Sequence, residues 1–464
     1  MNSSFPRGLQ AETAFTGVTI DSRNVRDGDL FIAIKGENHD GHDYVFNALD
    51  NGAAAAVVVR GWLSEQKRRS VRGRPLIPVD DTIEALQALS RYHRQRLGLP
   101  VVAITGSNGK TTTKDMTASV LRTRFRAMRS ESSFNNHIGV PLTLLWLRRS
   151  HEVAVVEMGM NHAGEIAHLC TVAEPTAGVI TNVSAAHLEF MGDLDSVAEA
   201  KAELAEAIGP HGFLVLNADD PKVAAMQKRS EARIITFGLE SDAQIKGEIV
   251  DFRRGIFAIF RINGGPAIHL EVPGIHNVMN GLAAAAVGEA MGCTPDQVKE
   301  GLEAFQGTSW RTEIVEADGI MVVNDSYNAN PVSASAALRL LSDFENGSSH
   351  RRIAVLGDML ELGETAAEFH LELGEQSAGS GIELLVAVGD FASEVIKGAV
   401  KAGLPSEMTI SSRDVDEAWR ELVPRLQQGD LVLVKGSRRM GLEKLVERIC
   451  ARHEALDAAG GEEN

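Results

Sequence analysis

The sequence predicts an α/β protein of three domains, and three observations support this fold class. The chain has 464 residues, more than one hydrophobic core usually organises. Hydrophobic residues make up 44% of it, enough to fill several cores. Short apolar runs alternate with helical patterns, which is typical of parallel sheets flanked by helices. We expect a small α/β domain over 1–98, a central domain over 99–312, a Rossmann-like domain over 313–457 and a disordered tail over 458–464.

The elements of these domains follow from apolar runs and turn signals. Pro100 resists continuation of the preceding helix, so a domain boundary is expected there. A hairpin signal at 263–265 adds a small antiparallel part to the central parallel sheet, and Asp318-Gly319 predicts a second hairpin. The expected strands are 17–20, 30–34, 54–59, 101–105, 153–157, 177–183, 213–217, 352–356, 384–388 and 431–434, and the expected helices are 82–96, 164–170, 196–208 and 277–291.

A glycine-rich turn follows the apolar run 101–105 and opens a helix that begins with Lys110-Thr111. Glycines let backbone N–H groups converge on phosphate oxygens, the Lys110 ammonium can approach them, and Thr111 can offer its hydroxyl to Mg²⁺. The turn is shorter than the standard P-loop, which needs glycine where Ile104 stands. A plain connecting turn is the alternative. The appended Lys-Thr favours a nucleotide site made by Gly106, Ser107, Asn108, Gly109, Lys110, Thr111 and Thr112.

Two further polar residues follow neighbouring strands of the expected central sheet. Glu157 ends the run 153–157, and His187 follows the run 177–183. Open parallel sheets bind ligands at the carboxyl ends of their strands, where the glycine-rich turn also lies. Alone, the first would be an exposed carboxylate and the second a hydrogen-bonded loop histidine. Together they are candidates for a metal ligand and a reacting group.

Charge and cysteine content exclude several classes of protein. A net charge of −17 argues against binding to nucleic acid or to an anionic membrane. Cys170, Cys293 and Cys450 have neither zinc-site nor disulfide spacing and are expected to fill apolar space. No run approaches the roughly 20 apolar residues that cross a bilayer, and no apolar leader follows Met1, so a soluble cytoplasmic protein is expected. The histidines at 39–43 lack a third metal-ligand cluster and are expected in a polar loop.

Other segments place polar residues at turns or on helices. Segment 130–141 carries amide side chains that suit a phosphate or an acyl group, with an Asx-rich turn as an equal alternative. Segments 322–331 and 434–439 each follow a strand and precede a helix, so they suit anions, although basic turns are common. Lys201 lies in helix-forming sequence, where an exposed lysine is the ordinary interpretation.

Taken together, these motifs make the chain resemble the Mur ligase family of peptidoglycan synthesis over nearly its whole length. The resemblance implies a domain that binds a UDP-linked substrate, a central ATPase domain and a Rossmann-like C-terminal domain. The motifs that carry it, in the family's order, are residues 105–112, Glu157, His187, 276–280, Arg311 and 324–326.

Within this family, the chain resembles the ligase that adds D-alanyl-D-alanine to UDP-N-acetylmuramoyl-tripeptide. Segments 325–331 and 355–363 and the later His370 carry this resemblance. The sibling that adds the third amino acid usually has Asp-Asn-Pro-Arg, which does not occur here. The residues assigned to the UDP-linked substrate are Ser22, Arg23, Lys35, Gly36, Asn135 and Asn136.

The resemblance implies a two-step reaction. A substrate carboxylate attacks the γ-phosphate of ATP, and an amine converts the resulting acyl phosphate into an amide. Lys110 and Mg²⁺ would offset charge on the transferred phosphoryl group, with Thr111 and Glu157 holding the first Mg²⁺. His187 would contact a second Mg²⁺ or assist the amine. The aligned lysine is carbamylated in related ligases, so Lys201 would become a metal ligand.

The remaining assignments also come from the resemblance. ATP would contact Asn280, Arg311 and Asp325, and the dipeptide would contact Tyr327, Asn328, Asn330 and Ser437. ATP and Mg²⁺ are the expected cofactors, the tripeptide and the dipeptide are the expected substrates, and a monomer is expected. The alternatives are a sibling Mur ligase, a folylpolyglutamate-synthase-like ligase, and a nucleotide-gated binding protein without turnover.

Overall fold

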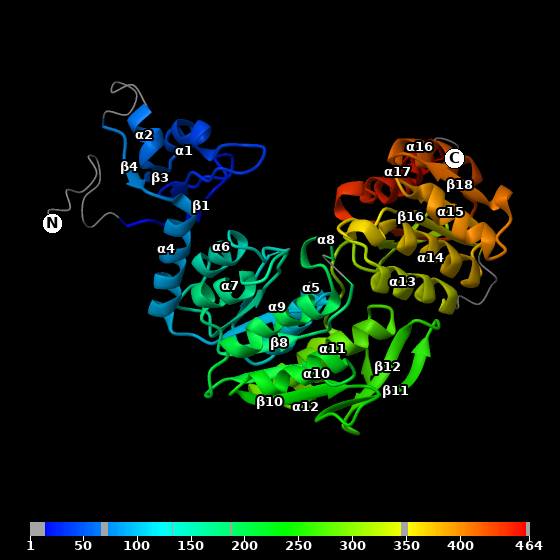
Figure 1. The fold of residues 1–464 in the computed structure, drawn as a ribbon, viewed down its shortest axis with the longest axis horizontal. Helices are drawn as coiled ribbons and strands as arrows, with labels where there is room; N and C mark the ends of the chain where they lie inside the picture. The colour runs from blue at the N-terminus through cyan, green and yellow to red at the C-terminus, as the bar shows by residue number, and fades with distance from the viewer. Residues whose placement is uncertain (1–13, 66–72, 132, 186–187, 345–350, 461–464) are drawn as a thin grey trace. The chain divides into compact units, whose positions relative to one another are not determined.

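The chain is described from a computed structural model that covers residues 14–65, 73–131, 133–185, 188–344 and 351–460. It forms two compact units. The first unit comprises Met1–Ala103, Arg126–Gly159 and Glu165–Thr176, and the second comprises Ile104–Phe125, Met160–Gly164 and Ala177–Asn464. The strands form three sheets, one in each expected α/β domain, which confirms the fold class (Figure 1).

The N-terminal sheet has four parallel strands in the order β1-β2-β3-β4. Alternate residues of its strands enter two cores, so that Phe31 packs with α1 and α2 while Ile32 packs with α4. The helix α4 begins at the N-cap Asp81 and ends at Gly98, whose φ of 64° suits glycine. The elements are β1 Val18–Thr19, β2 Leu30–Ile32, α1 Val45–Asp50, β3 Ala55–Val59, α2 Arg60–Glu65, β4 Leu76–Val79 and α4 Thr82–Leu97.

The central sheet combines parallel and antiparallel strands, as the sequence predicts. In the second unit the strand order is β13-β12-β11-β10-β9-β8-β5, with antiparallel pairing from β11 to β13, and in the first unit it is β5-β7-β6. The elements are β5 Val101–Thr105, α5 Lys110–Arg122, β6 Ala127–Arg129, α6 Gly139–Leu145, β7 Val153–Glu157, α7 Glu165–Ala173, β8 Ala177–Ile180, α8 Leu188–Met191, α9 Leu194–Ala207, β9 Phe213–Asn217, α10 Pro221–Ala225, β10 Arg233–Gly238, β11 Ile245–Arg253, β12 Phe257–Ile262, β13 Ile268–His269, α11 Ile275–Ala290 and α12 Pro295–Glu303.

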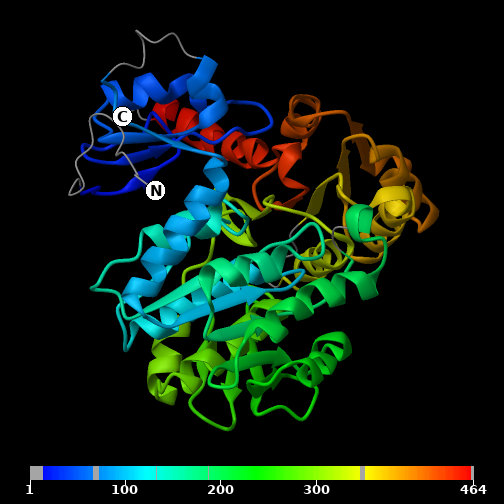
Figure 2. The same cartoon turned by 60° about the vertical axis from the view of Figure 1, so that its left-hand side comes forward.

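The C-terminal sheet has six strands in the order β14-β15-β19-β16-β17-β18, of which only β14 is antiparallel to its neighbour. Residues alternate between two cores, so Val323 and Leu433 pack with α13, α14 and α15, whereas Val322 and Val432 pack with α16 and α17. The two groups of helices cover opposite faces of the sheet (Figures 1 and 2). The elements are β14 Glu313–Ala317, β15 Ile320–Asp325, α13 Pro331–Asp343, β16 Arg352–Gly357, α14 Ala366–Gly379, β17 Leu384–Val388, α15 Ala392–Lys401, β18 Thr409–Ser412, α16 Val415–Leu422, β19 Leu431–Lys435 and α17 Glu443–Gly460.

Two smaller expectations concern turns and termini. The hairpin at Asp318-Gly319 is present, with φ values of 52° and 68° that match the left-handed turn this dipeptide favours. The helix α17 continues to Gly460, past residue 458 where the sequence predicts a disordered tail, and 461–464 lie outside the described residues. Cys170 and Cys293 are buried and Cys450 is half-buried. In the described part of the chain, no helix is long and apolar enough to cross a membrane.

Candidate active site

The glycine-rich turn joins β5 to α5 in a backbone conformation that requires glycine. Gly106 has a φ of 147° and Gly109 a φ of 79°, both outside the range that other residues adopt easily. A Cβ atom on Gly106 would lie 1.8 Å from Thr181 Oγ1, and one on Gly109 would lie 2.3 Å from Asn280 Oδ1. The side chains of Thr181 and Asn280 therefore pack closely against the two glycines, and the turn leads into the N-terminus of α5, where backbone N–H groups can meet a phosphate.

A segment that the sequence does not single out fixes the shape of this turn. The backbone N–H of Asn108 donates to Asn182 Oδ1 at 3.0 Å, and Asn182 Nδ2 and Thr181 Oγ1 both donate to the carbonyl oxygen of Asn108, at 3.0 and 2.6 Å. Ser107 Oγ donates to the carbonyl oxygen of Ser184. The strand β8 ends at Ile180, three residues earlier than predicted, because the next residues turn to make these bonds. A Thr-Asn-x-Ser run directly after a buried strand is the signal that marks them.

The lysine of the turn has its ammonium over the loop backbone. Lys110 is the first residue of α5, and its Nζ donates to the carbonyl oxygens of Gly106 and Ser107 at 2.9 and 3.1 Å. Thr111 follows it and is buried. A cation and a hydroxyl are thus placed at the same helix N-terminus, which is the combination that a nucleotide phosphate and its metal require.

Lys201 is buried on α9, so its interpretation as an exposed helix lysine is wrong. Only 2% of it is exposed, and no hydrogen bond or ion pair of Lys201 is found among the described residues. Burial lowers the pKa of Lys201 well below its usual value, and the nearby charge of Lys110 lowers it further. Lys201 shares an apolar stripe at helical spacing with Val197, Ala200 and Leu204, and this stripe is the sequence signal for its burial.

Glu157 ends β7 in the first unit and is also buried, with 1% exposed, so the exposed-carboxylate interpretation is wrong. Asn135 Nδ2 donates to Glu157 Oε1 at 2.7 Å. The neighbouring Asn136 uses its Oδ1 to accept from the N–H groups of Ile138 and Gly139, which is the Asx-turn alternative. Asn135 and Asn136 thus have different partners, and His187 lies outside the described residues.

Within the second unit, the phosphate loop contacts the segment assigned to the dipeptide. Asn330 is the N-cap of α13, and its Nδ2 donates to Asn108 Oδ1 at 2.7 Å. On the other side of the loop, Asn280 Oδ1 accepts from Thr113 Oγ1 at 3.1 Å. Predicted residues from three distant parts of the sequence therefore converge on one turn.

An ion pair and a stacked arginine lie in the same region of the second unit. Lys435 is buried, and its Nζ lies 2.6 Å from Asp325 Oδ2 and donates to the carbonyl oxygen of Asn328 at 2.9 Å. The guanidinium of Arg311 lies 4.0 Å from the ring centre of Tyr327. The flanking residue Thr312 has a φ of 51°, a strained conformation for a β-branched residue that is common at functional sites.

Ser437 is held by the segment 355–363. Its Oγ accepts from the N–H of Leu360 at 2.9 Å, and its own N–H donates to the carbonyl oxygen of Asp358. His370 supports this segment from below, because its Nε2 accepts from the N–H of Met359 at 2.9 Å. Burial lowers the pKa of His370, which favours the neutral ring that can accept this bond.

The residues assigned to the UDP-linked substrate in the N-terminal domain differ in exposure and in the partners they have. Arg23 is exposed and pairs with Asp21 at 2.8 Å, which lowers the pKa of Asp21 to about 2. Ser22 is buried. The backbone of Lys35 pairs with the backbone of Asp40 in an isolated antiparallel β-bridge, and the N–H of Gly36 donates to the carbonyl oxygen of His39. The expected polar loop at 39–43 contains a short 3₁₀ helix whose buried histidine accepts the N–H of residue 59.

Comparisons with known proteins cover nearly the whole chain. Three family models match: "Mur ligase family, catalytic domain" at residues 14–94, "Mur ligase middle domain" at 104–288, and "Mur ligase, glutamate ligase domain" at 310–438. UDP-N-acetylmuramoyl-tripeptide–D-alanyl-D-alanine ligase of Bacillus subtilis is 36% identical over 94% of this chain and 93% of its own length.

Solved structures agree with these matches. The crystal structure of MurF from Acinetobacter baumannii superposes with a TM-score of 0.82 and 31% identity, covering 94% of this chain and 93% of that one. MurF ligase from Thermotoga maritima, solved in complex with ADP, gives a TM-score of 0.81 and 28% identity, covering 96% of this chain and 100% of that one.

Proposed function

This chain belongs to the Mur ligase family, and we propose that it joins D-alanyl-D-alanine to UDP-N-acetylmuramoyl-tripeptide at the expense of ATP. Relatives that match over 93–94% of their own length carry this activity in their names. The observation that carries the proposal is the contact between Asn108 of the phosphate loop and Asn330 of the segment assigned to the dipeptide. A ligase of this kind must bring its ATP site and its amine site together.

The chemistry has two balanced steps. The terminal carboxylate of the tripeptide attacks the γ-phosphorus of ATP, the bond to the β-phosphate oxygen breaks, and ADP and an acyl phosphate result. The free amine of the dipeptide then attacks the acyl carbon, phosphate leaves, and the nitrogen loses a proton as the amide forms. The N–H groups at the start of α5 and the Lys110 ammonium stabilise the negative charge on the transferred phosphoryl group.

The proposed magnesium ion would be shared with the substrate phosphates. No cluster of three His, Cys, Asp or Glu side chains that could hold a metal by themselves occurs in the described ranges. Mg²⁺ commonly takes one or two protein oxygens and completes its shell with phosphates and water. Thr111 and Glu157 would supply the protein oxygens, and His187 would serve a second ion. When bound, Mg²⁺ neutralises phosphate charge.

Lys201 would serve as a carbamate, which converts a buried cation into a buried carboxylate. Carbamate formation requires a neutral amine, and the lowered pKa of Lys201 supplies one. The carbamate oxygens would then serve as a metal ligand near Lys110, whose positive charge favours a negatively charged group on Lys201. Loss of activity in Lys201→Ala with partial rescue by bicarbonate is expected, and full activity of that variant would contradict the role.

The remaining assignments divide the two substrates. Asn280, Arg311 and Asp325 would contact the nucleotide, and Tyr327, Asn328, Asn330 and Ser437 would line the dipeptide site. Ser22, Arg23, Lys35, Gly36 and the amides at 135 and 136 would serve the UDP-linked substrate. The buried ion pair of Asp325 with Lys435 would fix the border between the nucleotide and dipeptide sites.

Phosphate release tests the proposal. The purified protein is mixed with ATP, Mg²⁺ and UDP-N-acetylmuramoyl-tripeptide, and D-alanyl-D-alanine, D-alanine, L-lysine or L-glutamate is added singly. We expect release that depends on the tripeptide and is stimulated by the dipeptide at least about tenfold more than by any single amino acid. Equal stimulation by single amino acids would instead indicate a sibling or a folylpolyglutamate-type ligase. No release would indicate a binding protein.

A further inference from the structure

The proposed acceptor has a carboxylate at the end opposite its reacting amine, and the four residues assigned to it, Tyr327, Asn328, Asn330 and Ser437, carry no positive charge. A carboxylate that leaves water needs a charged or multiply donating partner. We infer that Arg438 binds the terminal carboxylate of the dipeptide and thereby selects an acceptor with a free C-terminus. This inference rests on the proposed function and adds a residue to it.

Two of the other cations near Ser437, Lys435 and Arg311, are already committed. Lys435 is buried and paired with Asp325 at 2.6 Å, so its charge is neutralised inside the fold. Arg311 lies over the ring of Tyr327 and is assigned to ATP. Arg438 directly follows Ser437, and 46% of its side chain is exposed. The neighbouring Arg439 is exposed as well, and Arg438 differs from it by the two contacts that orient its guanidinium.

Two contacts hold the Arg438 guanidinium in one orientation. Its central carbon lies 4.6 Å from the ring centre of Trp310, and its Nη1 lies 2.7 Å from Glu443 Oε1. Stacking on an indole and one carboxylate contact leave further N–H donors of the fork for a ligand. A guanidinium that is already oriented loses little conformational freedom when it takes a second carboxylate.

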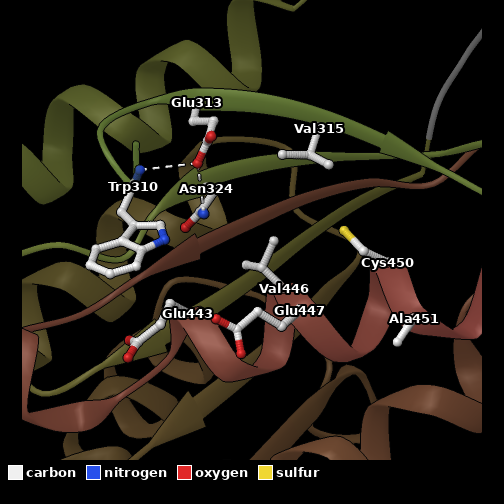
Figure 3. A pocket seen from close by; sticks show the side chains of 9 residues that line it. All are labelled: Trp310, Glu313, Val315, Asn324, Glu443, Val446, Glu447, Cys450 and Ala451. Carbon is white, nitrogen blue, oxygen red and sulfur yellow. Dashed lines mark hydrogen bonds between the residues drawn. The ribbon is translucent and has the colours of Figure 1, made fainter. Parts of the chain in front are cut away.

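The backbone of Trp310 is held by Glu313, as Figure 3 shows. Glu313 Oε2 accepts from the backbone N–H of Trp310 at 3.0 Å and from Asn324 Nδ2 at 3.1 Å, within the wall of a cavity of about 410 Å³ between β14 and α17. The backbone carbonyl of Trp310 accepts the N–H of Tyr327. Trp310 therefore contacts both Tyr327, which is assigned to the dipeptide, and Arg438.

A substrate analogue separates carboxylate binding from a merely structural role. The acceptors compared are D-alanyl-D-alanine and D-alanyl-D-alaninamide, which has the same amine but no terminal charge. For the unmodified protein we expect kcat/KM about 10- to 100-fold lower with the amide. Arg438→Met should lower kcat/KM for the dipeptide by a similar factor and treat the two acceptors alike. Arg438→Lys keeps the positive charge but loses the forked N–H donors, so its kcat/KM for the dipeptide should lie between those of the unmodified protein and Arg438→Met.

Arg448→Met is the matched control, because Arg448 is a partly exposed arginine of α17 that pairs with Asp416, and neither residue is assigned to a substrate. It should retain the discrimination of the unmodified protein. The inference is overturned if Arg438→Met still discriminates against the amide, or if the unmodified protein accepts both equally. If the unmodified protein releases no phosphate with either acceptor, the proposed function fails, and that outcome is distinct from a loss of discrimination.

Discussion

The phosphate loop and the C-terminal cluster around Asp325 are built in different ways. The loop is made by backbone conformation, with Gly106 and Gly109 at positive φ and with Asn182 bonded to its main chain. The cluster is made by side-chain pairs between distant residues, such as Asp325 with Lys435 and Trp310 with Arg438. A backbone site leaves a short motif in the sequence, whereas a side-chain site leaves scattered residues whose partnership only the fold reveals.

This difference predicts different consequences of mutation. A side chain that projects from the loop can be removed without disturbing the main-chain bonds that shape it. A partner removed from the cluster leaves a buried group unsatisfied. Loop variants should therefore lose activity and keep stability, and cluster variants should lose both.

The largest effect is expected for Lys110→Met. The change removes the ammonium that offsets charge on the transferred phosphoryl group, so kcat for tripeptide-dependent phosphate release should fall about 10³-fold. The thermal midpoint should change by less than about 2 °C, because the bonds from Thr181 and Asn182 still hold the loop main chain after the two bonds from Lys110 Nζ are lost. Steady-state kinetics and a thermal melt measure the two quantities. A variant with more than about a tenth of the original activity would contradict the role of Lys110.

A smaller effect, now on stability as well, is expected for Asp325→Asn. Lys435 is 2% exposed, and without the carboxylate its ammonium is buried unpaired, so the free energy of unfolding should fall by about 3 kcal/mol. Urea unfolding measures it. The double variant Asp325→Asn/Lys435→Met should recover part of the loss, because it removes the orphaned charge. If the loss in the double variant equals the sum of the losses in Asp325→Asn and Lys435→Met, the pair is not coupled.

The smallest effect is expected for Lys201→Met, which should raise the thermal midpoint by a few degrees in CO₂-free buffer at pH 7. The folded pKa of Lys201 lies well below its unfolded value of about 10.4, so between the two the unfolded chain binds the extra proton. Stability of the unmodified protein therefore rises with pH through that window. The advantage of the variant should shrink as the pH approaches about 10.

The exposed Lys228 provides the control for this measurement, since Lys228→Met should show no such pH dependence. A stability difference between Lys201→Met and the unmodified protein that stays constant from pH 7 to about pH 10 would mean that Lys201 is not buried as a neutral amine.

The sequence predicts the interior strands of this fold better than its edges. Four strands have no prediction. Three of them lie at the edge of their sheet: β4, which contains Pro78, the short β6, and β18, which is mostly polar; the fourth, β10, lies inside the central sheet. Edge strands tolerate proline and polar residues because one side makes no ladder bonds, so they lack the apolar run that marks interior strands such as β5.

The residues of the candidate site also differ in how far the sequence predicts them. The chain of residues from Gly106 to Thr111 was predictable, because its chemistry is local. The burial of Lys201 has a signal in the sequence, because Lys201 lies at helical spacing from the apolar residues Val197 and Leu204, although the composition of the helix suggests an exposed side chain. The pairing of Asp325 with Lys435, 110 residues apart, was not predictable, since neither residue carries a local signal of the other.

The central claim is that ATP activates the tripeptide carboxylate as an acyl phosphate, and isotope transfer tests it most directly. The terminal carboxylate of UDP-N-acetylmuramoyl-tripeptide is labelled with ¹⁸O, the reaction is run with ATP and D-alanyl-D-alanine, and the released phosphate is analysed by mass spectrometry. The proposed chemistry moves one carboxylate oxygen into each phosphate, so singly labelled phosphate is the expected product. Unlabelled phosphate formed together with the amide would show that the phosphoryl group never bonded to that carboxylate.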